Sequence, residues 1–157
     1  FRFIFLSIML QASMNIAAGY APTLVQNALK ALFPTVQTIG WSIDHDYYVA
    51  GFKYNGFNTK VWFTPQGRWK MKQTDWQVLD EAPDAVWHTF SFGPYSTDNI
   101  LDVTLVEFPN QKAQVVVHIG IDNAQTEYQL FYLMNGELIN ARNVTYMNDI
   151  LGASTFL

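Results

Sequence analysis

The sequence predicts an α+β fold built as a tandem duplication of one unit, a helix followed by a four-stranded antiparallel meander, with the helices packed on one face of the sheet. Two observations favour this fold. An amphipathic helical pattern occurs twice, and each time four short alternating segments separated by turn residues follow it. Half of the 157 residues are hydrophobic and only 14% are charged, which excludes intrinsic disorder and provides for a sizeable core.

The composition also excludes several classes of function. The chain has no cysteine, so disulfides, thiol catalysis and thiolate metal sites are excluded. Its 9 Lys and Arg against 13 Asp and Glu give a formal net charge of −4, which provides no overall attraction for nucleic acid or an anionic membrane. We therefore expect no nucleic-acid partner.

Residues 1–21 have the pattern of a secretory signal peptide. Arg2 lies at the start of an apolar run that ends at Leu10, and the small residues Ala17, Ala18 and Gly19 follow. The run is about half of the ~20 residues that a membrane-spanning helix needs. We therefore expect a periplasmic or secreted mature chain without a membrane span. The alternative is that the run forms a core helix or strand.

The first unit, residues 22–82, begins with a helix from Thr23. Its apolar residues recur at helical spacing up to Phe33, and Pro34 ends the pattern. Turn residues at 44–46, 55–56 and 65–67 then separate strand-like segments. These predicted strands are residues 38–44, 47–54, 57–64 and 68–75.

The second unit, residues 83–157, repeats this order. Pro83 is suited to the first turn of a helix that Gly93-Pro94 closes. The predicted strands are residues 99–108, 113–122, 126–134 and 138–144. Pro22 matches Pro83 and residues 61–67 match 130–136, which indicates duplication. The short polar stretch 79–83 marks the boundary and favours one compact body.

Aromatic and glycine motifs of the first unit form a family signature. They are Ala28-Leu29, Phe33-Pro34, Ile39-Gly40-Trp41, residues 48–52, residues 61–63 and Gly67-Arg68-Trp69. Over residues 23–144 the chain resembles PepSY-like periplasmic proteins with the β-lactamase-inhibitor-protein-like fold, of the Bacteroidetes type. The resemblance implies a non-enzymatic protein and supplies no catalytic residues. Better-known relatives of that fold bind and inhibit enzymes. The second unit has Phe131 and Leu138 where the first has Trp62 and Trp69.

The residues themselves also argue against an enzyme. His45, His88 and His118 are the three histidines, and no two of them have metal-ligand spacing on one helix. Asp44-His45-Asp46 fits a hairpin turn in which Asp bonds to local backbone. There is no Gly-x-Ser-x-Gly elbow and no glycine-rich phosphate loop. We expect no catalytic residue, no metal and no cofactor.

Strand alternation separates a core face from the face opposite the helices, which we call the open face. The predicted core face carries Trp41, Phe52, Phe63, Val117, Ile119 and Tyr132. The open face carries Trp62, Phe131, Val116 and His118 among polar residues. Exposed aromatics in a polar rim are typical of a protein-binding hot spot. The alternative is that these aromatics only cover the sheet or contact the segment after residue 144.

Charge is distributed unevenly between the units. Residues 22–82 hold six Lys or Arg and five acids, whereas residues 83–157 hold two and eight. Lys60, Lys70 and Lys72 are predicted on the open face, where they would orient an acidic partner. A solvated strand face, or packing against the acidic second unit, is the alternative.

The sequence therefore predicts a non-catalytic exported binding protein that docks its open face on a protein partner. Inhibition of an exported enzyme is one form of this function. The alternative is a periplasmic small-ligand or glycan-binding protein, in which the same aromatics stack on the ligand.

Overall fold

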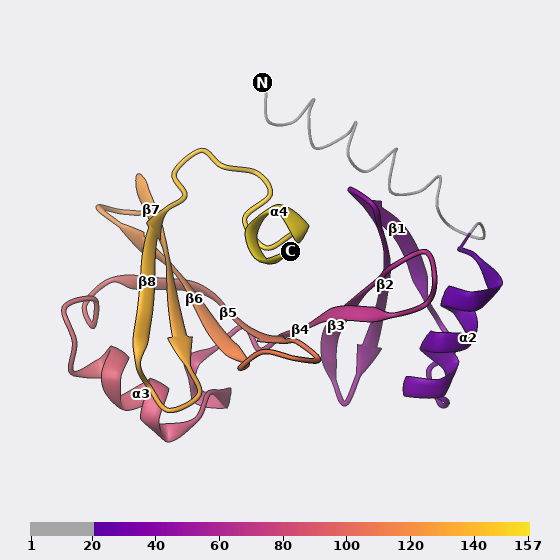
Figure 1. The fold of residues 1–157 in the computed structure, drawn as a ribbon. Coiled ribbons are helices and arrows are strands. Elements are labelled where there is room, and N and C mark those ends of the chain that lie inside the picture. The colour runs from indigo at the N-terminus through magenta and orange to yellow at the C-terminus, as the bar shows by residue number, and fades with distance from the viewer. Residues whose placement is uncertain (1–20) are drawn as a thin grey trace. The chain divides into compact units, whose positions relative to one another are not determined.

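The computed structural model describes residues 21–157 as an α+β fold with eight strands and few helices (Figure 1). The predicted signal peptide lies outside the described residues, except for Ala21. The strands are β1 (Gly40–Asp44), β2 (Tyr47–Tyr54), β3 (Phe57–Phe63), β4 (Trp69–Asp75), β5 (Asn99–Glu107), β6 (Gln114–Ile121), β7 (Thr126–Leu133) and β8 (Leu138–Asn143). The helices are α2 (Thr23–Leu32), the 3₁₀ helix η1 (Leu79–Glu81), α3 (Asp84–Ser91) and α4 (Ala153–Phe156).

The eight strands form one antiparallel sheet in which they follow chain order, from β1 to β8. Each predicted strand is present, with ends that differ by two residues or fewer. Two elements were not predicted: η1, in the stretch taken as a boundary, and α4, in the segment after residue 144. None of the helices within residues 21–157 has the length and apolar character needed to cross a membrane.

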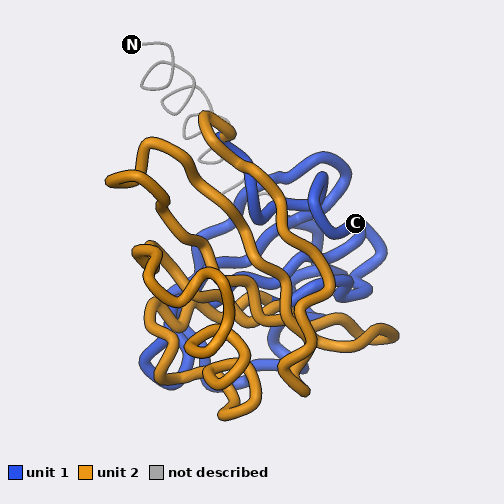
Figure 2. The backbone as a smooth tube through the Cα atoms, turned by 90° about the vertical axis from the view of Figure 1, so that its left-hand side faces the viewer, with its two compact units in different colours: residues 1–72, 148–157 blue, residues 73–147 orange. Residues whose placement is uncertain are grey.

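The chain divides into two compact units (Figure 2). Unit 1 contains the chain up to Lys72 together with Asn148–Leu157, and unit 2 contains Gln73–Met147. We call residues 148–157 the return segment, because the chain comes back to unit 1 after completing unit 2. The predicted boundary between the sequence repeats, at residues 82 and 83, stays a prediction.

In unit 1, α2 contributes to a core rich in aromatic residues. Val25 and Leu29, four residues apart on one face of the helix, are both buried. They belong to one hydrophobic cluster with β2 and β3 residues, whose members are Val25, Leu29, Phe33, Ala50, Phe52, Val61 and Phe63. Trp41 packs against this cluster. The predicted core positions of unit 1 are therefore confirmed.

In unit 2, α3 contributes to a mainly aliphatic core. Val86 and Phe90 are buried with the same spacing of four residues. Their cluster includes Val103, Val115, Val117, Ile119, Leu130 and Tyr132. Burial raises the pKa of Tyr132 to about 12. The core positions predicted for unit 2 are confirmed as well.

A glycine turn in each unit lies against the start of that unit's helix. Gly67, before β4, has φ +86°, and a Cβ there would lie 2.8 Å from the Leu24 carbonyl oxygen in the first turn of α2. Gly136, before β8, has φ +90°, and its Cβ would lie 2.5 Å from the Ala85 carbonyl oxygen of α3. Both positions therefore require glycine, for backbone conformation and for space.

Both long helices begin immediately after a proline. Pro22 has φ −56° and ψ 149°, and Pro83 has φ −54° and ψ 147°, so each occupies the N-cap position with extended backbone. The prediction that Pro83 lies within the first helical turn is wrong by one position. Its extended backbone places it just before the first helical residue, Asp84.

Candidate functional site

On the open face of unit 1, the sequence predicted that Trp62 is exposed, but the structure buries it. Val49 and Trp62 are opposite partners on β2 and β3, and both alternate with residues of the α2 cluster. Val49 and Trp62 are each only 4% exposed. The prediction that Trp62 is exposed to solvent is therefore wrong.

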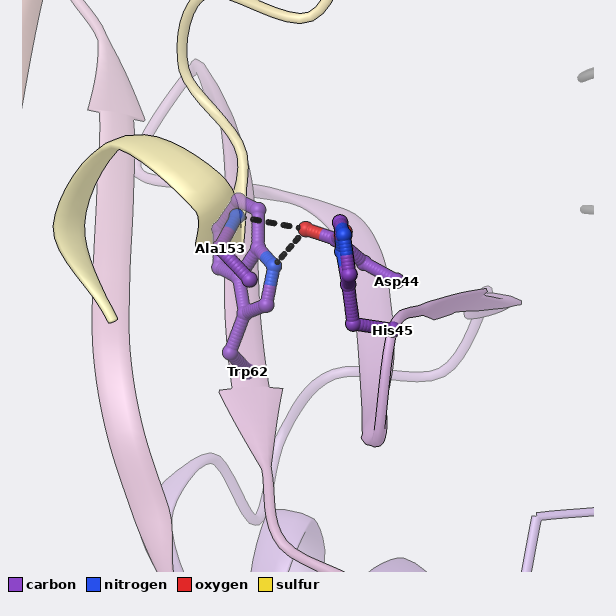
Figure 3. A network of polar contacts seen from close by, with 4 residues as sticks. All are labelled: Asp44, His45, Trp62 and Ala153. Atoms are coloured by element: carbon purple, nitrogen blue, oxygen red, sulfur yellow. Dashed lines mark hydrogen bonds and ion pairs between the residues drawn. The ribbon is translucent and has the colours of Figure 1, made fainter.

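The return segment explains the burial around Trp62 (Figure 3). Asp44, the last residue of β1, accepts two hydrogen bonds at Oδ2. One comes from the Trp62 indole Nε1 at 2.8 Å and the other from the Ala153 backbone N–H at 2.7 Å. Ala153 is also only 4% exposed. The expected alternative, in which the open-face aromatics contact the segment after residue 144, is thus what the structure has at Trp62.

Asp44 provides the cap that α4 lacks in its own sequence. The N-cap residue of α4 is Gly152, which makes no side-chain capping hydrogen bond. The first helical N–H, that of Ala153, is instead donated to Asp44 from 109 positions away along the chain. A carboxylate at this end of a helix also interacts favourably with the partial positive charge of the exposed N–H groups. A Cβ at Gly152 would meet the carboxylate of the exposed Asp149, so a larger residue there requires that side chain to move.

Asp44 remains ionised over most of the pH range. Burial opposes its ionisation, but hydrogen bonds from Trp62, Ala153 and His45 outweigh burial, so the pKa of Asp44 is lowered from its ordinary value. His45 Nδ1 lies 2.8 Å from Asp44 Oδ1. This hydrogen bond, with the nearby charges of Asp44, Asp149 and Asp46, raises the pKa of His45.

The turn after β1 differs in one respect from its expected role. Residues 45–46 do form the turn between β1 and β2, and His45 has φ +54°. The Asp44 carboxylate, however, bonds to Trp62 and Ala153 rather than to the local backbone. The sequence carries no signal for this long-range pair, because partners 18 and 109 positions away follow no local motif.

The open face of unit 2 has a row of polar residues across four strands. Asp102, His118, Gln129 and Arg142 are successive cross-strand partners. Arg142 donates a hydrogen bond to the Gln129 side-chain oxygen at 2.8 Å. His118 Nε2 lies 3.4 Å from a Glu127 carboxylate oxygen, and the His118 side chain is 20% exposed. His118 is therefore the predicted site residue that retains some access to solvent in unit 2.

Val116 and Phe131 are cross-strand partners on the same face, but their predicted exposure is wrong. Val116 is 2% exposed and Phe131 is 5% exposed. The Arg142 guanidinium carbon lies 5.9 Å from the centre of the Phe131 ring, within the range of a cation–π interaction. The long side chain of Arg142 therefore contributes to covering the aromatic ring.

The three predicted lysines do not share one position. Lys60 and Lys70 are exposed, and Lys60 is the cross-strand partner of Gly51. Lys72 Nζ instead lies 5.4 Å from the Phe33 ring centre and 5.7 Å from that of Tyr54. Phe33 belongs to the α2 cluster and Tyr54 packs against it, so the prediction that Lys72 lies on the open face is wrong. Attraction to these two rings holds Lys72 on the helix side.

An exposed aromatic cluster on unit 2 was not predicted. Trp87 and Phe92 are 42% and 77% exposed, with ring centres 6.4 Å apart. The His88 ring lies beside both, with its centre 4.7 Å from that of Phe92 and 6.1 Å from that of Trp87. The sequence offered one signal for this exposure: Trp87 and Phe92 do not share the spacing of four residues that joins the buried pair Val86 and Phe90. Exposed aromatics of this kind are candidates for a contact surface.

The groups gathered at Asp44 are suited to binding a backbone N–H. Within residues 21–157, no three His, Asp or Glu side chains are placed to hold a metal ion. The Asp44 carboxylate, aimed by Trp62 and His45, accepts a backbone N–H from the return segment. Since backbone N–H groups are common to all polypeptides, the arrangement can bind polypeptide at a helix start.

Comparison with solved structures gives close matches from Bacteroides. A DUF2874 family protein from Bacteroides uniformis is 50% identical, with a TM-score of 0.85, and the match covers 87% of this chain and 99% of that one. A protein from Bacteroides eggerthii, provisionally described as periplasmic, is 47% identical with a TM-score of 0.85, covering 88% and 100%. A BLIP-like protein from Bacteroides fragilis is 30% identical with a TM-score of 0.76, covering 83% and 93%.

Neither a model of a protein family nor a curated protein matches the chain. The solved structures suffice for the assignment, because the identity is high and almost the whole length of each relative is covered. They also support the predicted β-lactamase-inhibitor-protein-like fold. The chain belongs to the DUF2874 family.

Proposed function

We propose that this chain is a non-catalytic exported protein that binds a protein partner through the open face of unit 1. Export is supported by the signal-like residues 1–21 and by the provisional periplasmic description of the Bacteroides eggerthii relative. Protein binding is supported by the BLIP-like fold of the Bacteroides fragilis relative. Inhibition of an exported enzyme is the form of binding that this fold suggests.

One observation carries the proposal: the open face of unit 1 already holds a polypeptide segment. Asp44 binds the N–H of Ala153, and the Trp62 indole supports the same carboxylate oxygen. A solvated strand face needs neither a buried tryptophan nor a carboxylate directed at a helix N-terminus. These features suit a surface that receives polypeptide.

Charge around this face favours an acidic partner. Unit 1 within the described residues holds six Lys or Arg and three Asp or Glu, whereas unit 2 holds two and ten. Lys60 on β3 and Lys70 on β4 are both exposed. They would accelerate association with an acidic surface and make it depend on ionic strength. The proposed contact through His118 would lie on unit 2, where the buried Val116 and Phe131 offer little surface.

We also infer that the two sequence repeats, residues 22–82 and 83–157, arose by duplication. This is supported by the nearly equal backbone angles of Pro22 and Pro83, and by Gly67 and Gly136, each against the second residue of a helix. On this inference Trp62 and Phe131 occupy corresponding positions. The PepSY-like relationship stays a prediction from the aromatic signature.

Charge reversal tests the proposed binding face. The Lys60→Glu, Lys70→Glu double variant and a Lys30→Glu variant would be compared with the wild type as baits in a periplasmic fraction. Lys30 is an exposed lysine in the last turn of α2, so it serves as the matched control. A specific partner should bind wild type and the control but be lost or weakened with the double variant. Equal capture by all three baits would place the partner elsewhere.

A second candidate function is recognition of a glycan or another ring-bearing ligand. Burial of Trp62 and Phe131 removes the aromatics first assigned to it, but the exposed pair Trp87 and Phe92 could stack on such a ligand. Titration of a glycan panel monitored by tryptophan fluorescence tests this candidate. Binding that Trp87→Ala abolishes would support it, and an unchanged spectrum across the panel would remove it.

A further inference from the structure

We propose that the exposed face of α3 in unit 2 docks on the basic open face of unit 1 in a second copy of this chain. The inference rests on the proposed function, because it uses the same face of unit 1, and it deepens that function by naming an acidic partner. Three features carry it: the exposed aromatic cluster on α3, the acidic chain around that cluster, and the exposed lysines of unit 1.

The exposed face of α3 combines aromatic rings with a carboxylate. Trp87 and His88 follow Asp84 by three and four residues, so the three side chains share one face of the helix. All three are exposed. Phe92, directly after the helix, is 77% exposed, and its ring meets that of Trp87 edge to face at 82°. These rings therefore present apolar surface to solvent next to a negative charge.

The chain around this cluster is acidic. Residues 73–111 contain seven Asp or Glu and no Lys or Arg. Asp80 and Glu81, in η1 just before α3, are exposed like Asp84. Aromatic faces attract cations, and nearby carboxylates add to that attraction. A surface of this composition fits a partner that presents lysine or arginine side chains.

The open face of unit 1 presents such lysines. Lys60 on β3 is the cross-strand partner of Gly51, and Lys53 lies two residues from Gly51 along β2, so both lysines are on one face as diagonal neighbours. Both are exposed. Gly51 also pairs with Gly40 on β1, and a Cβ at either glycine would meet nothing closer than 3.7 Å. The glycine pair therefore leaves space beside the lysines that a ring of the other copy can enter.

The contact would repeat a chemistry that the chain already uses in both units. Lys72 Nζ lies 5.4 Å from the centre of the Phe33 ring, and the Arg142 guanidinium carbon lies 5.9 Å from that of Phe131. Between copies, Lys53 and Lys60 would take the place of these cations. We choose a second copy as the occupant because unit 1 is rich in Lys and Arg and unit 2 in Asp and Glu, so each copy supplies both complementary faces.

A contact between two unlike faces is head-to-tail. After one contact forms, the pair still has one unused face of each kind, so further copies can add. The wild type should therefore form larger assemblies as its concentration rises. Raising the salt concentration from about 0.05 M to about 0.5 M should weaken this association about tenfold or more, because salt screens exposed charges.

The test uses two variants that each remove one face. In the first, Lys53→Glu and Lys60→Glu reverse the charge of unit 1, and in the second, Trp87→Ala and Phe92→Ala remove the rings of α3. Sedimentation equilibrium of protein purified from the periplasmic fraction measures their mass. Each variant alone should stay monomeric at concentrations at which the wild type associates. An equal mixture should form pairs and stop there, because each variant supplies the face that the other lacks.

A control variant separates the proposed contact from net charge. Lys30→Glu with Lys112→Glu makes the same change in charge at two other exposed lysines, so it should associate as the wild type does. Since all the substituted side chains are exposed, the variants should keep the melting temperature of the wild type within a few degrees.

Four results would overturn the inference. They are a wild type that is monomeric at every concentration, association of either face variant alone, a mixture that stays monomeric, and loss of association in the control variant. Each is distinguishable from failure of the proposed function, because capture of another protein that depends on Lys60 and Lys70 would still stand.

Discussion

The two units share a frame but fill it with different side chains. Each begins its helix after a proline and places a glycine turn against the first helical turn. In unit 1 the core cluster contains three phenylalanines, whereas in unit 2 seven of its ten buried members are Val, Leu or Ile. The two units thus have these few backbone requirements in common, whereas their cores differ in side-chain shape.

The open faces differ more than the cores. In unit 1, Trp62 donates an N–H to Asp44, and Asp44 caps α4. At the position that the proposed duplication makes equivalent, the Phe131 side chain has no N–H to donate, and its ring lies near the Arg142 guanidinium. One indole N–H therefore contributes to holding the carboxylate that caps α4 in unit 1, whereas the ring in unit 2 is partly covered by its neighbour.

The largest expected effect tests whether both cores stabilise the fold. Phe63→Ala in unit 1 and Leu130→Ala in unit 2 remove fully buried side chains. We expect losses of about 3 to 5 kcal/mol and about 2 to 5 kcal/mol, respectively. Unfolding by denaturant measures both. An unchanged midpoint for either variant would show that its cluster does not stabilise the protein.

Giving unit 1 the aromatic residue of unit 2 isolates the indole N–H. Trp62→Phe should lower the free energy of unfolding by about 1.5 to 3 kcal/mol, because Asp44 loses a hydrogen bond. A double-mutant cycle with Asp44→Asn should reveal a coupling free energy between the two residues. Strict additivity would mean that the hydrogen bond contributes nothing to stability.

The glycine turns test how similar the two frames are. Gly67→Ala and Gly136→Ala each place a Cβ at positive φ and against a helix carbonyl. We expect each substitution to lower the free energy of unfolding by about 1 to 3 kcal/mol or more. Gly56→Ala is the matched control, since φ there is also positive but nothing lies within 4 Å of the added Cβ. A loss at Gly56 equal to the other two would attribute the whole effect to backbone conformation.

The smallest effect is a pH dependence confined to unit 1. The pKa of His45 is raised, so its protonated form stabilises the native state below the ordinary value of 6.5. That contribution is lost as the pH rises through the native pKa. Asp44 acts in the opposite direction: its lowered pKa adds stability above the ordinary 3.8, which is lost on further acidification.

Unfolding curves on both sides of neutrality, for wild type and His45→Gln, measure the histidine contribution. The wild type should lose a small part of its stability as the pH rises, and the variant should not. Identical pH profiles would show that the contact between His45 and Asp44 has no effect on folding.

The sequence predicted the frame well because periodicity and turn residues are local. The run from Tyr47 to Tyr54 and the glycine turns specify strands and hairpins without reference to the rest of the chain. Alternation also separated Phe63 from Trp62 correctly. It failed to predict what covers Trp62, since that depends on Ala153, 91 positions further along the chain. Lys72 shows a second limit, because its contacts with Phe33 and Tyr54 override the face that alternation gave.

The measurement that most directly tests the account is amide hydrogen exchange at Ala153, followed by NMR on the intact protein. If Asp44 binds the return segment as described, the Ala153 amide should exchange slowly in wild type. In Asp44→Ala it should exchange far faster, while amides between β2 and β3 keep their protection. Exchange of the Ala153 amide at the rate of an unstructured peptide in wild type would contradict the claim that the open face of unit 1 holds polypeptide.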